Sequence, residues 1–264
     1  MTARRGLSLI GLLISIVCVV VLLSVMLPAL RTATTGLSDS GGQSTASAWA
    51  AADKVNLYAI GQSMLAGGLG VGMDSMWASP AASTGRRDVS ENTTANLYSL
   101  LIMDQRVQPS HLISRGDRGL VEIDDDYDFT AYDPRSGVYW DPSFTADLSR
   151  MSNTSWAHMP LQGARYDNHW RNSMSGSFPL FGSRGPEDGV LDPDSVTCHN
   201  GQWTGSIWSA DGSVRSLESI GSWNASINGG EDNLFRVDDP RRGADAVLGF
   251  TRSIDEDGVT LQWD

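Results

Sequence analysis

Cysteine is scarce in this chain of 264 residues, which has only Cys18 and Cys198. Two cysteines so far apart exclude a disulfide framework, and they exclude a cysteine-based zinc site because such sites take ligands from closely spaced pairs. Cys18 lies inside a long apolar run, so a bond between the two is not expected. The fold must therefore be stabilised by an apolar core, to which nine tryptophans contribute.

Basic residues are also few, with 19 Lys and Arg against 31 Asp and Glu and a net charge of −12 at pH 7. Such a chain is a poor partner for nucleic acid, because phosphates bind basic surfaces. It is equally unsuited to adhesion on anionic lipid. An acidic surface leaves two interpretations open, a solvated exterior and a site for a divalent cation.

The sequence lacks the motifs of common enzymes. Its four histidines are His111, His158, His169 and His199, and none has the spacing of a zinc hydrolase. The nucleophile elbow, the phosphate-binding loop and the dinucleotide-binding pattern are also absent. We therefore predict that the chain is not an enzyme and has no cofactor, and we keep an anchored hydrolase built from distant Asp and His residues as a third hypothesis.

What the chain does have is a long apolar run near its start. Residues from Leu7 to Leu27 include no charge, and Arg4 and Arg5 precede them. About 18 or more apolar residues predict a membrane-spanning helix, which satisfies its own backbone groups in lipid. The preceding arginines predict a cytoplasmic N-terminus and an exported acidic domain. A cleavable secretory signal is the competing interpretation, with a usual apolar region of about 7–15 residues.

The junction at the start of this run resembles that of type IV prepilins and type II secretion pseudopilins. Gly6 is followed by residues 7–10, Leu-Ser-Leu-Ile, after two arginines. The resemblance implies that prepilin peptidase cuts between Gly6 and Leu7 and that Leu7 is then methylated. It also implies a single-pass protein of the bacterial inner membrane whose helix packs beside other pseudopilins, with a periplasmic or extracytoplasmic head.

Two further segments are similar to large-domain members of this family. Residues 56–64 match an Asn-Leu-x-x-Ile-Gly-x-x-Met segment, and His199 precedes Asp211-Gly212 in the manner of a signature hairpin. The implied fold is α+β, a long N-terminal hydrophobic helix followed by a pilin-like head with an antiparallel β-sheet.

One residue departs from the family pattern. Gly11 stands where most members carry a glutamate that is thought to meet the N-terminal amine of a neighbouring subunit. This departure favours a second hypothesis, in which the chain is a single-pass, membrane-anchored binding module that does not assemble.

The predicted organisation follows from composition and periodicity, together with the prepilin resemblance, which implies the leader. We predict a leader at 1–6, a transmembrane helix at 7–30, a stalk at 31–66 and a head at 67–264. The stalk has a Gly-rich joint and then an amphipathic helix, because glycine is unfavourable inside a helix.

The amphipathic helix is predicted to begin near Thr45 and to end at Gly67-Gly68. The residues at i, i+3, i+4, i+7 and i+8 from Leu57 form one face, with a small residue, Gly61, where another element crosses. A loop is expected from Gly68 to Thr94.

Later segments predict a short helix and several strands. The helix is expected at 96–103, and the clearest strands at 155–161, 177–181, 203–210 and 213–217. Asp-Gly between the last two strands predicts a two-residue type I′ turn. That turn would place Trp208 opposite Arg215.

Two acidic runs were considered as calcium ligands, since calcium takes six to eight oxygens. The first is Asp124, Asp125 and Asp126, for which a solvated loop is the alternative. The second is 255–258, Asp-Glu-Asp-Gly, which is better explained as a turn.

Overall fold

The computed structural model describes residues 43–68, 79–86, 88–171, 176, 178–192, 198–199, 202–220, 226–227, 230–238 and 245–264. The predicted leader, the transmembrane helix and the Gly-rich joint lie outside the described residues. Within these ranges, no helix is both long enough and apolar enough to cross a membrane. The chain divides into two units, Met1–Ala48 and Trp49–Asp264, and the second contains the fold described below.

The first described element is helix α2, Gln43–Gly68. Its many alanines favour a helix, and it ends at the predicted glycine. Its first residue precedes the predicted cap by two positions. The predicted face is confirmed, because Leu57, Ile60 and Met64 are fully buried whereas Val55 and Tyr58 are exposed.

A second helix, α4 (Thr94–Met103), packs beside α2 and is two residues longer than predicted. Thr93 caps it, since its hydroxyl accepts a hydrogen bond from the Asn96 amide at 3.2 Å. The segment expected to be a loop also contains α3 (Pro80–Ser83) and the 3₁₀ turn η1 (Val89–Glu91). These short turns were missed because they begin at local caps rather than with an apolar period.

The main sheet has four antiparallel strands in the order β1-β2-β5-β6. Their bounds are β1 Trp156–His158, β2 Pro179–Ser183, β5 Gly205–Ser209 and β6 Val214–Leu217. Each falls within or beside a predicted strand. Helices together with an antiparallel sheet confirm the predicted α+β class.

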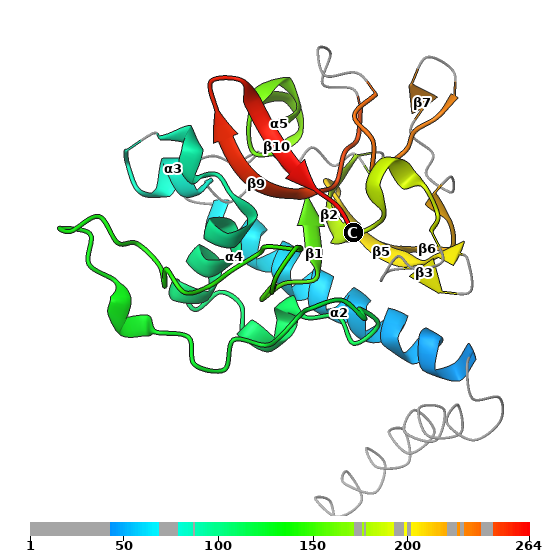
Figure 1. Cartoon of the computed structure of the whole chain (residues 1–264), viewed down its shortest axis with the longest axis horizontal. Helices are drawn as coiled ribbons and strands as arrows, with labels where there is room; N and C mark the ends of the chain where they lie inside the picture. The colour runs from blue at the N-terminus through cyan, green and yellow to red at the C-terminus, as the bar shows by residue number, and fades with distance from the viewer. Residues whose placement is uncertain are drawn as a thin grey trace, which may run out of the picture. The chain divides into compact units, whose positions relative to one another are not determined.

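A separate hairpin near the C-terminus pairs β9 (Phe250–Asp255) with β10 (Gly258–Gln262). It contacts β1 and α4, as Figure 1 illustrates for the red strands. The remaining elements are short: η2 Pro109–Leu112, η3 Phe129–Ala131, α5 Gly163–His169, η4 Glu187–Gly189, β3 Cys198–His199, β4 Gln202–Trp203, β7 Ser226–Ile227 and β8 Gly230–Glu231.

The β5–β6 hairpin corrects the predicted turn. The Ser209 amide donates to the Ser213 carbonyl at 3.0 Å, so the loop has three residues rather than two. Only its last residue, Gly212, has a positive φ, at 81°, whereas a type I′ turn needs two such residues. The extra loop residue shifts the register, so Trp208 lies opposite Val214 and the predicted pairing with Arg215 is wrong.

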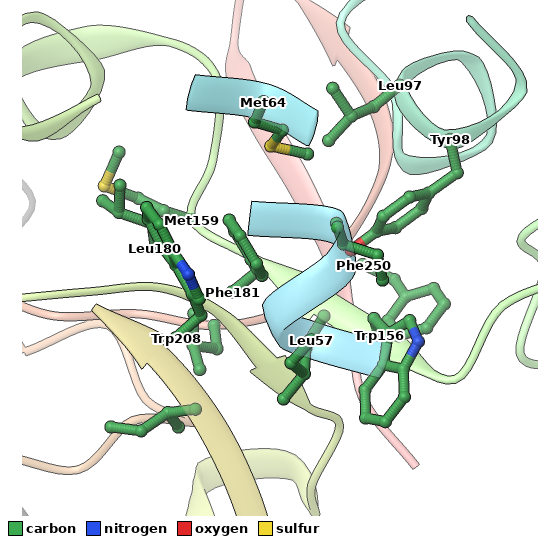
Figure 2. Close-up of a cluster of buried hydrophobic side chains, with 14 of the residues drawn as sticks. Leu57, Met64, Leu97, Tyr98, Trp156, Met159, Leu180, Phe181, Trp208 and Phe250 are labelled. Atoms are coloured by element: carbon green, nitrogen blue, oxygen red, sulfur yellow. The ribbon is translucent and has the colours of Figure 1, made fainter. Parts of the chain in front are cut away.

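The core lies between the two helices and the strands. Figure 2 shows Leu57 and Met64 of α2 facing side chains from α4, β1, β2, β5 and β9. Trp208 stacks on Phe181 with ring centroids 4.7 Å apart and planes inclined by 6°. Because these residues come from all parts of the described head, α2 is an integral part of its core.

Candidate functional site: the docking face of helix α2

One face of α2 is the surface on which the rest of the head is built. Leu57, Ile60 and Met64 repeat at helical spacing and are fully buried. Burying such side chains contributes about 1.5–3 kcal/mol each. This face therefore fixes α2 in the head by apolar contact along about two turns.

Gly61 lies in the middle of this face, directly beneath Trp208. A methyl group at Gly61 would lie 2.1 Å from Trp208 Nε1, closer than any real contact. The absence of a side chain therefore lets the indole of β5 lie against the helix backbone. This confirms the expectation that another element crosses the helix at this glycine.

Asp53 occupies the same face one turn before Leu57 and is 8% exposed. The Ser114 hydroxyl donates a hydrogen bond to Asp53 Oδ2 at 2.8 Å. The other carboxyl oxygen, Oδ1, is buried and has no hydrogen-bond partner among the described residues. Burial raises the pKa of Asp53 to about 6, and the nearby carboxylate of Asp117 adds to the rise.

A buried ion pair lies next to this contact. Arg184 Nη2 is 2.6 Å from Asp117 Oδ1, and both side chains are almost completely buried. Asp117 Oδ1 also accepts from the Gly119 amide at 2.8 Å. Arg184, which follows β2, thus ties the loop containing Ser114 and Asp117 to the main sheet.

These polar residues were not identified from the sequence. One feature of the sequence could have identified Asp53. It extends the apolar period of α2 by one turn, and a charged residue at that position must be buried. Ser114, Asp117 and Arg184 had none, because they come together only through the packing of distant segments.

The residues predicted from the prepilin pattern are placed as follows. Gly6 and Leu7 lie outside the described residues. His199 belongs to β3, where its backbone pairs with Gln202 of β4. Asp211 and Gly212 form the β5–β6 turn, in which Asp211 Oδ1 accepts from the Ser213 amide at 2.9 Å. Asp211 therefore has a structural role in the turn of the β5–β6 hairpin.

The predicted calcium ligands Asp124, Asp125 and Asp126 lie in a loop, and the latter two are exposed. Among the described residues, their carboxylates do not form a group that one ion could contact. Calcium at this run stays a prediction. The second run, 255–258, forms the β9–β10 turn, in which Asp255 Oδ1 accepts from the Asp257 amide at 2.9 Å.

A different set of carboxylates does come together. Single oxygens of Asp232, Asp238 and Asp245 all lie within 4.8 Å of one another, so these are the residues whose positions would allow a shared cation. Arginines already contact two of them: Arg165 pairs with Asp245, and Arg236 Nε lies 2.5 Å from Asp238 Oδ1.

The three carboxylates and two guanidinium groups leave one negative charge, which a single proton would balance. Burial raises the pKa of Asp232 to about 6, and the carboxylate of Asp245 adds to the rise. Asp232 therefore is the group that would hold this proton.

The described surface has a small depression of about 160 Å³ between the start of α4 and the β9–β10 hairpin. This is below the roughly 300–1,000 Å³ of a typical small-molecule site. Its lining is part polar and part apolar and includes one carboxylate and no histidine: Thr93, Ala95, Thr145, Ala146, Asp147, Thr251, Arg252 and Gln262. The depression does not bring a carboxylate and a histidine together, as a hydrolase of the third hypothesis would need.

Among the histidines whose burial the structure describes, the most deeply buried lies elsewhere. His158 in β1 is fully buried, and its ring nitrogens lie 2.8 Å from Thr94 Oγ1 and 2.7 Å from the Met159 carbonyl oxygen. Burial lowers the pKa of His158 to about 4, so the ring is neutral at pH 7. It serves as a polar link between α4 and the sheet.

Comparison with known proteins gave no relatives: no protein-family model, no curated protein and no solved structure matches this chain.

Proposed function

We propose that the chain is a pseudopilin-like structural subunit of a type II secretion or type IV pilus-type assembly in a bacterial envelope. The observation that carries this proposal is the long helix α2, one face of which is buried against an antiparallel sheet. This packing occurs in a chain whose sequence also carries the Gly6–Leu7 pattern. Residues 7–30 would anchor the protein in the inner membrane with the N-terminus cytoplasmic. The head would lie on the periplasmic or extracytoplasmic side.

In this proposal the function is assembly rather than chemistry. Prepilin peptidase would cut after Gly6, and Leu7 would become the methylated N-terminus. The anchor would then pack beside the anchors of other pseudopilins. The docking of α2 in the head supports this role, because Leu57, Ile60 and Met64 hold the helix that follows the predicted anchor and joint firmly against the head.

Processing is tested by mass spectrometry of the full chain produced in a bacterium that has prepilin peptidase. We expect a mature protein that begins with methylated Leu7. The variant Gly6→Val should keep the leader, whereas Gly11→Ala, at a nearby glycine outside the cleavage junction, should be processed normally. A wild-type protein that still begins at Met1, or that begins after residue 30, would contradict the proposal.

The second candidate function is a membrane-anchored binding module that does not assemble. The substitution of Gly11 for the usual glutamate favours it, because an intramembrane carboxylate is costly and is kept for a function.

Cys18 offers a native probe for this question, since it lies within the predicted anchor. Oxidation in membranes should join neighbouring subunits through Cys18 if they assemble. Cys198→Ser should retain that product and Cys18→Ser should lose it. Processed protein without any cross-link would favour the binding module.

A further inference from the structure

We propose that residues 112–119, here called the strap, form a proton-controlled latch on helix α2. The strap holds the helix when Asp53 carries a proton and loosens when Asp53 is ionised. This inference concerns how the helix is held in the head, and it stands whether or not the chain assembles with others.

The strap contacts α2 at three successive levels. The Ser114 hydroxyl donates to Asp53 at 2.8 Å, and the Asn56 side-chain amide reaches the Ile113 carbonyl at 3.5 Å. At the third level the strap passes close to Trp49, since a methyl group on Gly116 would lie 3.7 Å from Trp49 Cε3. Of the two hydrogen bonds, only that of Asp53 is short and buried.

The other side of the strap is fixed to the sheet. The Ser114 amide donates to Ser155 Oγ at 3.1 Å, and the Ser155 amide donates to the Leu112 carbonyl at 2.8 Å. The Asp117–Arg184 ion pair adds a second attachment. The strap is thus firmly joined to the sheet, and Leu112 packs in the same apolar core as Leu57. The Asp53 contact is the short, buried hydrogen bond that joins the strap to α2.

The charges around this contact make it sensitive to a proton. Asp117 on the strap and Arg184 after β2 are the charged groups buried beside Asp53, whereas Lys54 on α2 and Arg115 and Arg118 on the strap are exposed. Asp53 Oδ1 and Asp117 Oδ2 are both buried without a hydrogen-bond partner among the described residues. One arginine balances one carboxylate, so an ionised Asp53 is an uncompensated buried charge.

The direction of the effect follows from the pKa. Burial raises the pKa of Asp53 from its ordinary value of 3.8 to about 6. The contribution of the latch is therefore complete below about pH 4 and is lost as the pH rises through 6. A shift of this size changes the ratio of closed to open strap by up to about 100-fold.

The test is hydrogen exchange of the full chain in detergent micelles at pH 5 and pH 8, corrected for the intrinsic exchange rate. We expect peptides that cover 112–119 and 49–56 to be about 10- to 100-fold more protected at pH 5. Asp53→Asn should give high protection at both pH values, because an amide can still accept from Ser114 and carries no charge. Asp232→Asn changes the other buried aspartate with a raised pKa, so it should leave the pH dependence of the strap unchanged.

A second variant keeps the test decisive if Asp53→Asn fails to fold. Ser114→Ala removes the hydrogen bond to Asp53 and should lower protection at pH 5 to the level seen at pH 8. Equal protection of the wild-type strap at the two pH values would overturn the proposal. So would a pH dependence that survives in Asp53→Asn. Neither result depends on cleavage at Gly6, so failure of the latch is distinguishable from failure of the assembly function.

Discussion

Replacement of Gly61 by alanine tests the most specific contact in the head. The added methyl group would lie 2.1 Å from Nε1 and 2.3 Å from Cε2 of Trp208, so one element must move. Trp208 has little freedom to move, since it is fully buried and stacked on Phe181. The clash therefore falls on the distance between α2 and β5.

The size of the effect is set by two opposing terms. Overpacking a well-filled core costs about 1–3 kcal/mol and sometimes more. Alanine regains about 1 kcal/mol over glycine inside a helix. Because the methyl group here meets a rigid indole ring rather than a flexible chain end, we place the cost at about 2–4 kcal/mol. The net loss in the free energy of unfolding is then about 1–3 kcal/mol, or a fall in Tm of about 3–10 °C.

The assay is thermal and urea denaturation followed by tryptophan fluorescence, which reports on the nine tryptophans together, Trp208 among them. Gln62→Ala is the matched control, because Gln62 is exposed on the neighbouring position of α2 and its change should stay within about 0.5 kcal/mol. If Gly61→Ala were as stable as the wild type or more stable, the helix propensity would outweigh the contact. The account of Trp208 lying against the helix backbone would then be refuted.

Further predictions concern charge and backbone conformation. Arg184→Ala should destabilise the head by about 3–5 kcal/mol in urea denaturation, because it leaves Asp117 buried and unpaired. Arg86→Ala breaks the exposed pair with Glu91 at 3.6 Å and should cost less than about 1 kcal/mol in the same assay. The pKa of His158 is lowered to about 4, so its contribution to stability is present above pH 6.5 and falls by up to about 3 kcal/mol as the pH drops through 4. A series of Tm values from pH 7 to 4 measures this loss, and His158→Gln should flatten the pH dependence of Tm. The pKa of Asp232 is raised to about 6, so Asp232→Asn should raise Tm at pH 8 and leave it nearly unchanged at pH 4, and a lower Tm at pH 8 would contradict the single-proton explanation. Gly212→Ala should cost about 1–2 kcal/mol in the same assay, because a φ of 81° is unfavourable for a residue with a side chain.

Local sequence patterns predicted α2, α4 and the four strands of the main sheet, but not the short turns α3 and η1 or the pairing of distant elements. The period of Leu57, Ile60 and Met64 correctly identified the buried face of α2, and a small residue on that face correctly indicated a crossing element. Which element crosses it could not be predicted, because Trp208 is distant in the sequence and is one of nine tryptophans.

The β5–β6 hairpin shows how one loop residue changes a prediction. Asp-Gly is compatible with a type I′ turn and also with a three-residue loop that ends in a left-handed glycine. The second arrangement occurs here, since Gly212 alone has a positive φ and the flanking pair is Ser209 with Ser213. The choice depends on Trp208 being directed to the core, which is a tertiary effect that the turn residues do not encode.

The residues of the candidate site were likewise only partly predictable from the sequence. Asp53 could have been recognised as a buried charge, because it lies on the apolar period of α2. Its partners could not, since Ser114 and Asp117 lie in a segment without regular periodicity. The cluster that contains Asp232 and Asp245 was missed for the same reason, whereas the consecutive acids at 124–126 attracted attention but are not brought together.

The position of α2 in the sequence has a consequence for how the protein is made. Ile60 and Gly61 are synthesised long before Trp208 and Phe250, the residues that cover them. At a synthesis rate of about 5–20 residues per second, Trp208 and Phe250 follow the apolar face of the helix by roughly 7–40 seconds. During this interval α4 and β1 can cover only part of that face, and the rest is open to transient partners such as a chaperone. A substitution that slows the formation of β5 should therefore reduce the yield of folded protein by more than its effect on the final stability.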